Sequence, residues 1–210
     1  MMTIIVTMMV IIVKGISSLA GEIRQTMIER TGVLLAKKGL QGTSFTEVLE
    51  ASGAPRGSLY HHFPGGKEEL VMAAVAWVSA RALDRVEQLR GRPAMEVADA
   101  FITMWRDILK ASDFGAGCAV LAVTVGADTP NLLDSAAQVF RRWRAALSEL
   151  LALGGVPTAR APALAAMLIS ACEGAVVLAR AEQAMEPFDL VATEQRALVK
   201  AATTRKKRMS

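Results

Sequence analysis

Hydrophobic residues recur at intervals of three and four along most of this 210-residue chain, and that spacing predicts a series of helices. An amphipathic segment at residues 24–38 predicts the first helix. The longest patterns, separated by Gly, Pro and Asp clusters, lie at residues 67–90, 94–110, 131–153 and 158–185, and a final helix extends to about residue 204. The sequence predicts an all-α fold of nine helices.

One apolar segment, at residues 118–127, is ambiguous because it is short and uninterrupted by polar residues. Periodicity alone would also allow a buried strand. Because helices surround it on both sides, we expect it to be helical.

The segment from Ser44 to Phe63 predicts two short helices joined by a tight turn. Ser44 followed by Glu47 has capping-box spacing and opens a helix at about Phe45. Gly53 ends that helix, and Pro55, whose φ suits a first helical position, is expected to start the next.

In the second of these helices, Leu59 and Phe63 are four residues apart and share one buried face. Arg56, Tyr60 and His61 are then turned away from the core, as is Ser58. A helix–turn–helix of this kind offers its second helix to the major groove of DNA.

The sequence GTSFTEVLEASGAPRGSLYHHFPGGKEEL resembles the DNA-binding motif of the TetR family of bacterial repressors, most clearly in GSLYHHF followed by Lys67. The resemblance covers roughly residues 22–72. It implies a three-helix DNA-binding head at residues 17–66 and a six-helix effector-binding and dimerisation body at residues 67–204.

The resemblance also assigns roles to residues of the motif. It places Tyr60 and His62 on phosphates and His61 nearer the bases, and Lys67 binds a phosphate together with the backbone N–H groups that open the next helix. The family often has Ser or Thr where Pro55 stands, so a capping hydroxyl is missing here. The expected DNA contacts are Ser44, Thr46, Arg56, Ser58, Tyr60, His61, His62 and Lys67.

Net charge adds little to this picture. The chain carries a formal charge of +4, which equals the four positive charges in the basic tail at residues 205–210. Residues 17–70 are neutral overall, with six basic and six acidic residues, but no acidic residue interrupts residues 51–67. A local basic patch of this kind can face phosphates because salt limits the interaction to roughly 8 Å.

The N-terminal extension at residues 1–16 begins with thirteen uncharged residues. It lacks the basic start of a secretory signal and is too short to span a membrane. We expect a misplaced start codon or a disordered extension. A β-prone strand that pairs with another chain is the alternative, and no membrane partner is predicted.

Bulky apolar residues of the body predict an effector pocket, with ordinary core packing as the alternative reading of each. The stretch GCAVLAVTVGAD resembles a segment of the lincomycin-resistance and flavonoid-responsive repressor branch, where it lies beside the pocket. The expected lining is Trp77, Phe101, Met104, Trp105, Cys118, Leu121, Val125, Met167 and Leu178.

Small residues near the C-terminus leave room for close approach of a second helix, and the resemblance implies pairing of the last two helices in a homodimer. The expected interface includes Ala166, Ile169, Gly174 and Ala175; packing within one chain is the alternative.

Catalysis, metal binding and cofactor binding are not predicted. The two cysteines give no disulfide framework or metal spacing, which suits a reduced cytoplasm. His61 and His62 are adjacent and diverge by about 100° on a helix. Gly65-Gly66-Lys67 lacks the rest of a phosphate loop.

These features predict a cytoplasmic dimeric repressor that binds a palindromic DNA operator and is released by a small apolar or aromatic effector. The alternative is a ligand-binding or structural dimer whose head no longer binds DNA.

Overall fold

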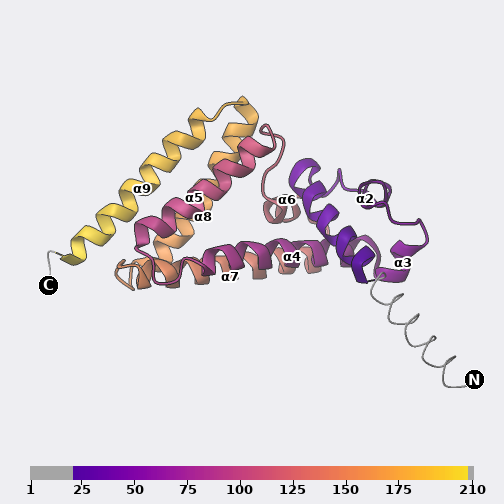
Figure 1. The fold of residues 1–210 in the computed structure, drawn as a ribbon, viewed down its shortest axis with the longest axis horizontal. Helices are drawn as coiled ribbons and strands as arrows, with labels where there is room; N and C mark the ends of the chain where they lie inside the picture. The colour runs from indigo at the N-terminus through magenta and orange to yellow at the C-terminus, as the bar shows by residue number, and fades with distance from the viewer. Residues whose placement is uncertain (1–20, 208–210) are drawn as a thin grey trace, which may run out of the picture.

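The structure is a computed structural model that describes residues 21–207, with side chains described as far as residue 203. These residues form nine helices and contain no strand. Figure 1 shows a small head at one end and a longer helical body at the other, which confirms the predicted all-α architecture. The predicted extension at residues 1–16 and the side chains of the basic tail lie outside the described residues.

The head consists of a first helix, described over residues 21–38, followed by α2 (Phe45–Ser52) and α3 (Ser58–His62). Its core is fully buried and includes Met27, Leu35, Leu59 and Phe63. The predicted pairing of Leu59 with Phe63 on one buried face is confirmed.

The turn between α2 and α3 follows from local chemistry. The Ser44 hydroxyl accepts a hydrogen bond from the Glu47 N–H at 3.2 Å, and the Glu47 carboxylate accepts one from the Ser44 N–H, so the predicted capping box is present. Gly53 ends α2 in the left-handed conformation, at φ 68°.

The predicted start of the second helix at Pro55 is wrong by three residues. Pro55 instead begins a single turn, in which its carbonyl accepts from the Ser58 N–H at 3.0 Å. The helix proper therefore has only five residues, Ser58–His62.

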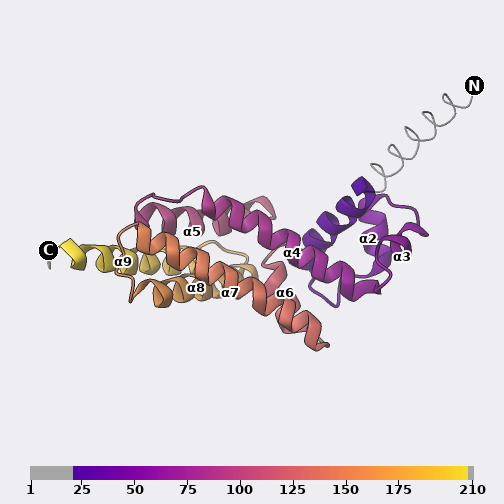
Figure 2. The same ribbon diagram turned by 90° about the horizontal axis from the view of Figure 1, so that it is seen from below.

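In the body, α4 (Gly66–Glu87) leaves the head and lies alongside α7 (Pro130–Leu153), as Figures 1 and 2 show. The other body helices are α5 (Ala94–Ala111), α6 (Ala119–Gly126), α8 (Ala161–Glu182) and α9 (Glu186–Lys207). The ambiguous apolar segment is thus helical, as expected, and its Val120 and Val123 are fully buried.

The break between the last two helices lies slightly before its predicted position. Gln183 ends α8 with a φ of 51°, and Glu186-Pro187 opens α9. Proline suits a first helical turn because the N–H that it lacks would have no intrahelical acceptor there. By length and composition α8 could cross a membrane, but half of its most apolar window is buried within this fold, as in a core helix.

The head is joined to the body by more than α4. The Gly117 N–H donates to the Ala36 carbonyl at 2.8 Å, and the Gln41 amide donates to the Gly126 carbonyl at 3.3 Å. The segment through α6 therefore touches the head at both of its ends.

Candidate DNA-contact surface and effector cavity

The outward face of α3 and the turn before it carries four of the expected DNA contacts. Arg56 and His61 are exposed, Ser58 is half-buried, and Tyr60 is 68% exposed. The Tyr60 ring rests edge-on against Phe45, with ring centroids 5.8 Å apart. This contact orients the phenol while leaving it accessible to a duplex.

His62 lies in a different environment from His61. It is half-buried, and burial lowers its pKa, as do the nearby charges of His61 and Arg24. Since the ordinary pKa of histidine is about 6.5, His62 is neutral at physiological pH and offers an N–H donor rather than a positive charge.

Ser44 and Thr46 lie at the exposed N-terminal end of α2. The Ser44 hydroxyl is already engaged in the capping box. Lys38 forms an ion pair with Glu47, and hydrogen bonds from Lys38 and then the Ser44 backbone lower the pKa of Glu47 to about 2. This end of α2 is held in place before any ligand arrives.

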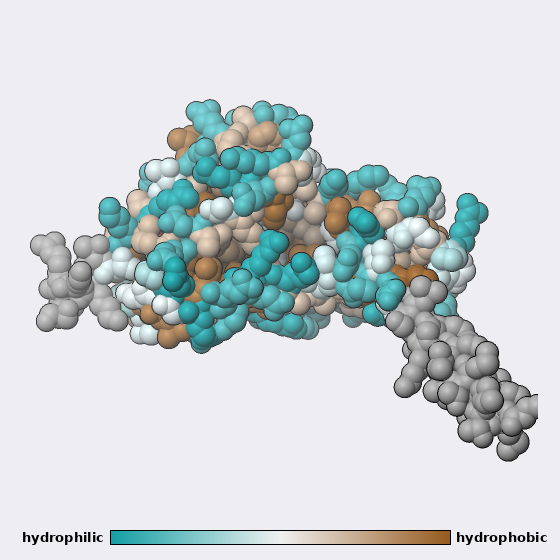
Figure 3. Space-filling model, viewed as in Figure 1, coloured by the Kyte–Doolittle hydropathy of each residue, from teal (hydrophilic) through white to brown (hydrophobic). Residues whose placement is uncertain are grey.

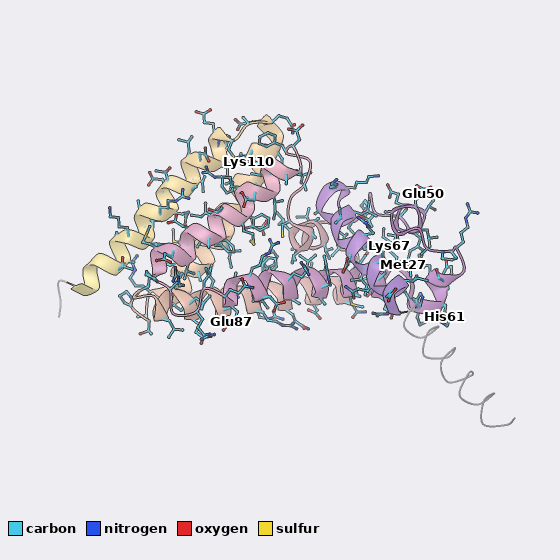
Figure 4. The ribbon with its side chains drawn as sticks, viewed as in Figure 1. Met27, Glu50, His61, Lys67, Glu87 and Lys110 are labelled. Carbon is cyan, nitrogen blue, oxygen red and sulfur yellow. The ribbon has the colours of Figure 1, made fainter. Side chains whose placement is uncertain are left out.

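Lys67 is placed differently from its expected role. Its ammonium donates to the Leu40 carbonyl at 3.0 Å, and the side chain is half-buried. The Gly65 N–H donates to the Glu69 carboxylate at 2.9 Å, so an acid of the same chain occupies the N-terminal end of α4. Figure 4 places Lys67 nearer the body and His61 at the outer end of the head.

A cavity of about 290 Å³ lies where the head meets the body. Its walls come from the first helix, α4, α5, the segment leading into α6, and α7. Figure 3 shows pale and brown apolar residues between α5 and α4, framed by hydrophilic ones. The lining comprises Gly32, Val33, Ala36, Lys37, Trp77, Val78, Arg81, Ala82, Arg85, Met104, Trp105, Ile108, Ala116, Gly117, Cys118, Ala119 and Trp143.

Four residues of the expected pocket line this cavity: Trp77, Met104, Trp105 and Cys118. The other five lie elsewhere, so their assignment is corrected. Phe101 borders a separate void of about 20 Å³, and Leu121 packs against the core. Val125 is 81% exposed on the outer side of α6, and Met167 and Leu178 are half-exposed on the outer side of α8.

The sequence did not lead us to expect two groups of residues in the cavity lining: those of the first helix and those with a positive charge. Gly32, Val33, Ala36 and Lys37 line the cavity from the first helix. A Cβ on Gly32 would come within 3.1 Å of Val78 Cγ2, which shows how closely that helix approaches α4. The i, i+4 spacing of Trp77, Arg81 and Arg85 was the available signal for the other side.

A buried acid lies behind the cavity wall. Glu173 on α8 is 7% exposed, and its carboxyl oxygens have no hydrogen-bond partner of ordinary geometry, although the Cys118 thiol lies beside them. Burial raises the pKa of Glu173 to about 7. Burial raises the pKa of the Cys118 thiol well above its ordinary range and that of Cys172 to about 12, so neither forms a reactive thiolate.

The outer surface of α8 and α9 contains a shallow groove of about 480 Å³. Gly174 is exposed and Ala175 lies buried at its floor, whereas Ala166 is half-buried. Ile169 is 5% exposed and packs inside the chain, so its assignment to an interface is corrected. Leu178 and Leu190 border the groove and are exposed.

The fold and the α2–α3 motif define a helix–turn–helix DNA-binding protein with a helical body. Residues 28–74 match the family of bacterial regulatory proteins of the tetR family, and residues 94–194 match the LmrA/YxaF-like C-terminal domain of transcriptional regulators. The chain is 35% identical over 183 residues to the uncharacterized HTH-type transcriptional regulator Rv0196 of Mycobacterium tuberculosis, covering 84% of this chain and 93% of that one. It therefore belongs to the TetR family of transcriptional regulators.

Other relatives agree with this placement. The HTH-type regulator YxaF of Bacillus subtilis is 29% identical over 188 residues, covering 86% of this chain and 96% of that protein. A TetR-family regulator from Agrobacterium tumefaciens shares the fold, with a TM-score of 0.75 at 20% identity, over 88% of this chain and 99% of that one. These relatives are transcriptional regulators rather than enzymes. No cluster of three or more His, Cys, Asp or Glu suited to a metal occurs among the described residues.

Proposed function

We propose that this regulator is a repressor that binds a palindromic operator as a homodimer and is released by a small apolar or aromatic effector in the cavity. The observation that carries the proposal is the position of the cavity. Val33 and Lys37 of the head line one side of it, and Trp105 of the body lines another. A ligand there contacts both parts at once.

Release then follows from differential affinity. A ligand that fits one spacing of head and body better than another shifts the population toward that spacing. By linkage, the same free energy that weakens operator binding weakens effector binding on the operator. Two hydrogen bonds join the head to the body, Gly117 to Ala36 and Gln41 to Gly126, and a change in the spacing of head and body would strain them.

Operator contact is assigned to Arg56, Ser58, Tyr60 and His61, all on the accessible face of the motif. Ser44, Thr46 and His62 are assigned to phosphates at its edge. The Lys67 ammonium donates one N–H to the Leu40 carbonyl, so only its remaining N–H groups can bind a phosphate. A five-residue recognition helix offers few base contacts, so two heads on two half-sites are needed for a specific site.

Dimerisation is assigned to the groove between α8 and α9. Exposed Leu178 and Leu190 flank Gly174, where an added Cβ would meet nothing within 4 Å. Two such faces related by a two-fold axis would bury these leucines against each other. Because the proposed partner is chromosomal DNA, we assign the protein to the cytoplasm.

The test is a fluorescence-anisotropy titration of a labelled duplex from upstream of the protein's own gene, at two salt concentrations. Tight binding that weakens with salt, and that Tyr60→Ala abolishes, supports the repressor. Tyr60→Phe is the matched control because it keeps the ring contact with Phe45 and removes only the hydroxyl.

A second candidate is a ligand-binding dimer whose head no longer binds DNA. Two observations favour it: the ammonium of Lys67 is engaged with Leu40, and the Glu69 carboxylate occupies the N-terminal end of α4. A folded dimer that binds the upstream duplex no more tightly than random DNA would support this candidate.

A further inference from the structure

Positive charge gathers where the cavity opens to solvent. Lys37 of the first helix, together with Arg81 and Arg85 of α4, lines the cavity and is exposed, and no lining residue is Asp or Glu. Among the described residues none of the three forms an ion pair. Arg85 also borders a neighbouring cleft that contains Asp107, so its charge is shared between the two.

One of the three cations is fixed by a contact within the fold, and a second reaches the same cavity from the head. The Arg81 guanidinium lies 5.4 Å from the centroid of the Trp77 ring, which also lines the cavity. That contact fixes the guanidinium over the aromatic wall and leaves its N–H donors free. Lys37 faces the same cavity from the head, one turn after Val33.

Two indole N–H groups in the wall behind the cavity have no acceptor. Trp105 and Trp143 line the cavity, are 4% and 8% exposed, and their indole Nε1 atoms are buried without a partner. A buried N–H left unpaired costs about 1–3 kcal/mol. Because neither nitrogen is exposed to the open cavity, the two indoles present apolar surface to a ligand, and the polar contacts with it must come from the cations.

We propose that the effector is an acidic aromatic molecule: a flat apolar body against the tryptophans of the cavity wall, and one anionic oxygen group held by Lys37 and Arg81. The anion would then bind a cation of the head and a cation of α4 simultaneously. This inference deepens the effector role proposed above and rests on it for its regulatory meaning.

An anionic group bound by both Lys37 and Arg81 would connect the ligand directly to the head. A neutral ligand would act on the head only through packing against Gly32, Val33 and Ala36. An anionic ligand adds a charge-assisted hydrogen bond to Lys37, whose length depends on how the first helix sits against α4. Acidic compounds should therefore be stronger effectors than neutral compounds of the same shape.

The test compares two fluorescent probes with the same aromatic body: anilinonaphthalene sulfonate, which is anionic, and N-phenyl-naphthylamine, which is neutral. All three tryptophans of the chain line the cavity, so energy transfer from tryptophan to the probe reports binding there. The full-length protein should bind the anionic probe roughly three- to tenfold more tightly than the neutral one.

Lys37→Gln should remove most of this preference and leave the affinity for the neutral probe unchanged. Lys38→Gln is the matched control, since Lys38 is the adjacent lysine, pairs with Glu47 and does not line the cavity. Equal affinity of the wild-type protein for the two probes would overturn the proposal. So would a Lys37→Gln variant that binds both probes more weakly to the same extent, or a Lys38→Gln variant that behaves like it.

The titration uses no DNA, so its outcome is independent of whether the head binds an operator. A failure of operator binding with the probe preference intact would reject the repressor and keep the acidic ligand. The reverse pattern would keep the repressor and reject the charge bridge.

Discussion

The buried carboxyl of Glu173 predicts that neutralising one side chain makes this protein more stable at high pH. The side chain is 7% exposed, and burial raises its pKa from the ordinary 4.5 to about 7. The folded state therefore holds a proton that the unfolded chain has released between these two pH values. Stability contributed by the protonated carboxyl is complete below about pH 4.5 and is lost as the pH rises through 7.

The magnitude follows from the separation of the two pKa values. Each pH unit over which only the folded state is protonated costs about 1.4 kcal/mol, so the loss between pH 4.5 and 7 is roughly 3 kcal/mol. Glu173→Gln keeps the shape and cannot ionise. We expect it to match the wild type near pH 4.5 and to exceed it by about 3 kcal/mol at pH 8, or roughly 6–12 °C in melting temperature.

The assay is chemical denaturation followed by circular dichroism from pH 4.5 to 8, at one protein concentration because the proposed dimer would make stability depend on concentration. Glu182→Gln is the matched control, since Glu182 lies on the same helix and is exposed. Parallel pH profiles for the wild type and Glu173→Gln would refute the reasoning, because a carboxyl ionised in both states contributes no pH dependence.

Three further substitutions follow from contacts in the structure. Gly32→Val should destabilise the fold by about 1–3 kcal/mol, measured by thermal unfolding, because its Cβ would crowd Val78 Cγ2 at 3.1 Å; an unchanged melting temperature would contradict this. Gly174→Glu should yield a folded monomer in sedimentation velocity, since the site is open within one chain, whereas Gly174→Ala should stay dimeric. Ser44→Ala should cost about 1 kcal/mol through loss of the capping box with Glu47, and a loss below 0.3 kcal/mol in urea denaturation would argue against that role.

Features set by neighbouring residues were predictable from the sequence. The capping box at Ser44 and the left-handed Gly53 depend on a few adjacent residues, and both are confirmed. Pro55 was harder, because its fixed φ suits the start of a helix and also the single turn that it in fact forms. Local preference did not distinguish the two.

The cavity could be predicted only in part, because periodicity gives the apolar face of a helix but not its neighbour. Of the residues expected in an effector pocket, Trp77 and Trp105 do line the cavity, whereas Val125 lies on the exposed side of α6. α6 is apolar all round, so its sequence does not indicate which side is buried. The part played by Lys37 depends on how the head docks on the body, which no local pattern encodes.

The most direct test of a dimeric operator-binding regulator is a hydroxyl-radical footprint on the upstream duplex, with wild type and Tyr60→Ala side by side. We expect two protected half-sites related by two-fold symmetry, with centres about one helical turn or a multiple of it apart, and no protection by the variant. Uniform protection along the duplex, or an identical footprint from both proteins, would contradict the assignment of α3 as the element that reads the operator.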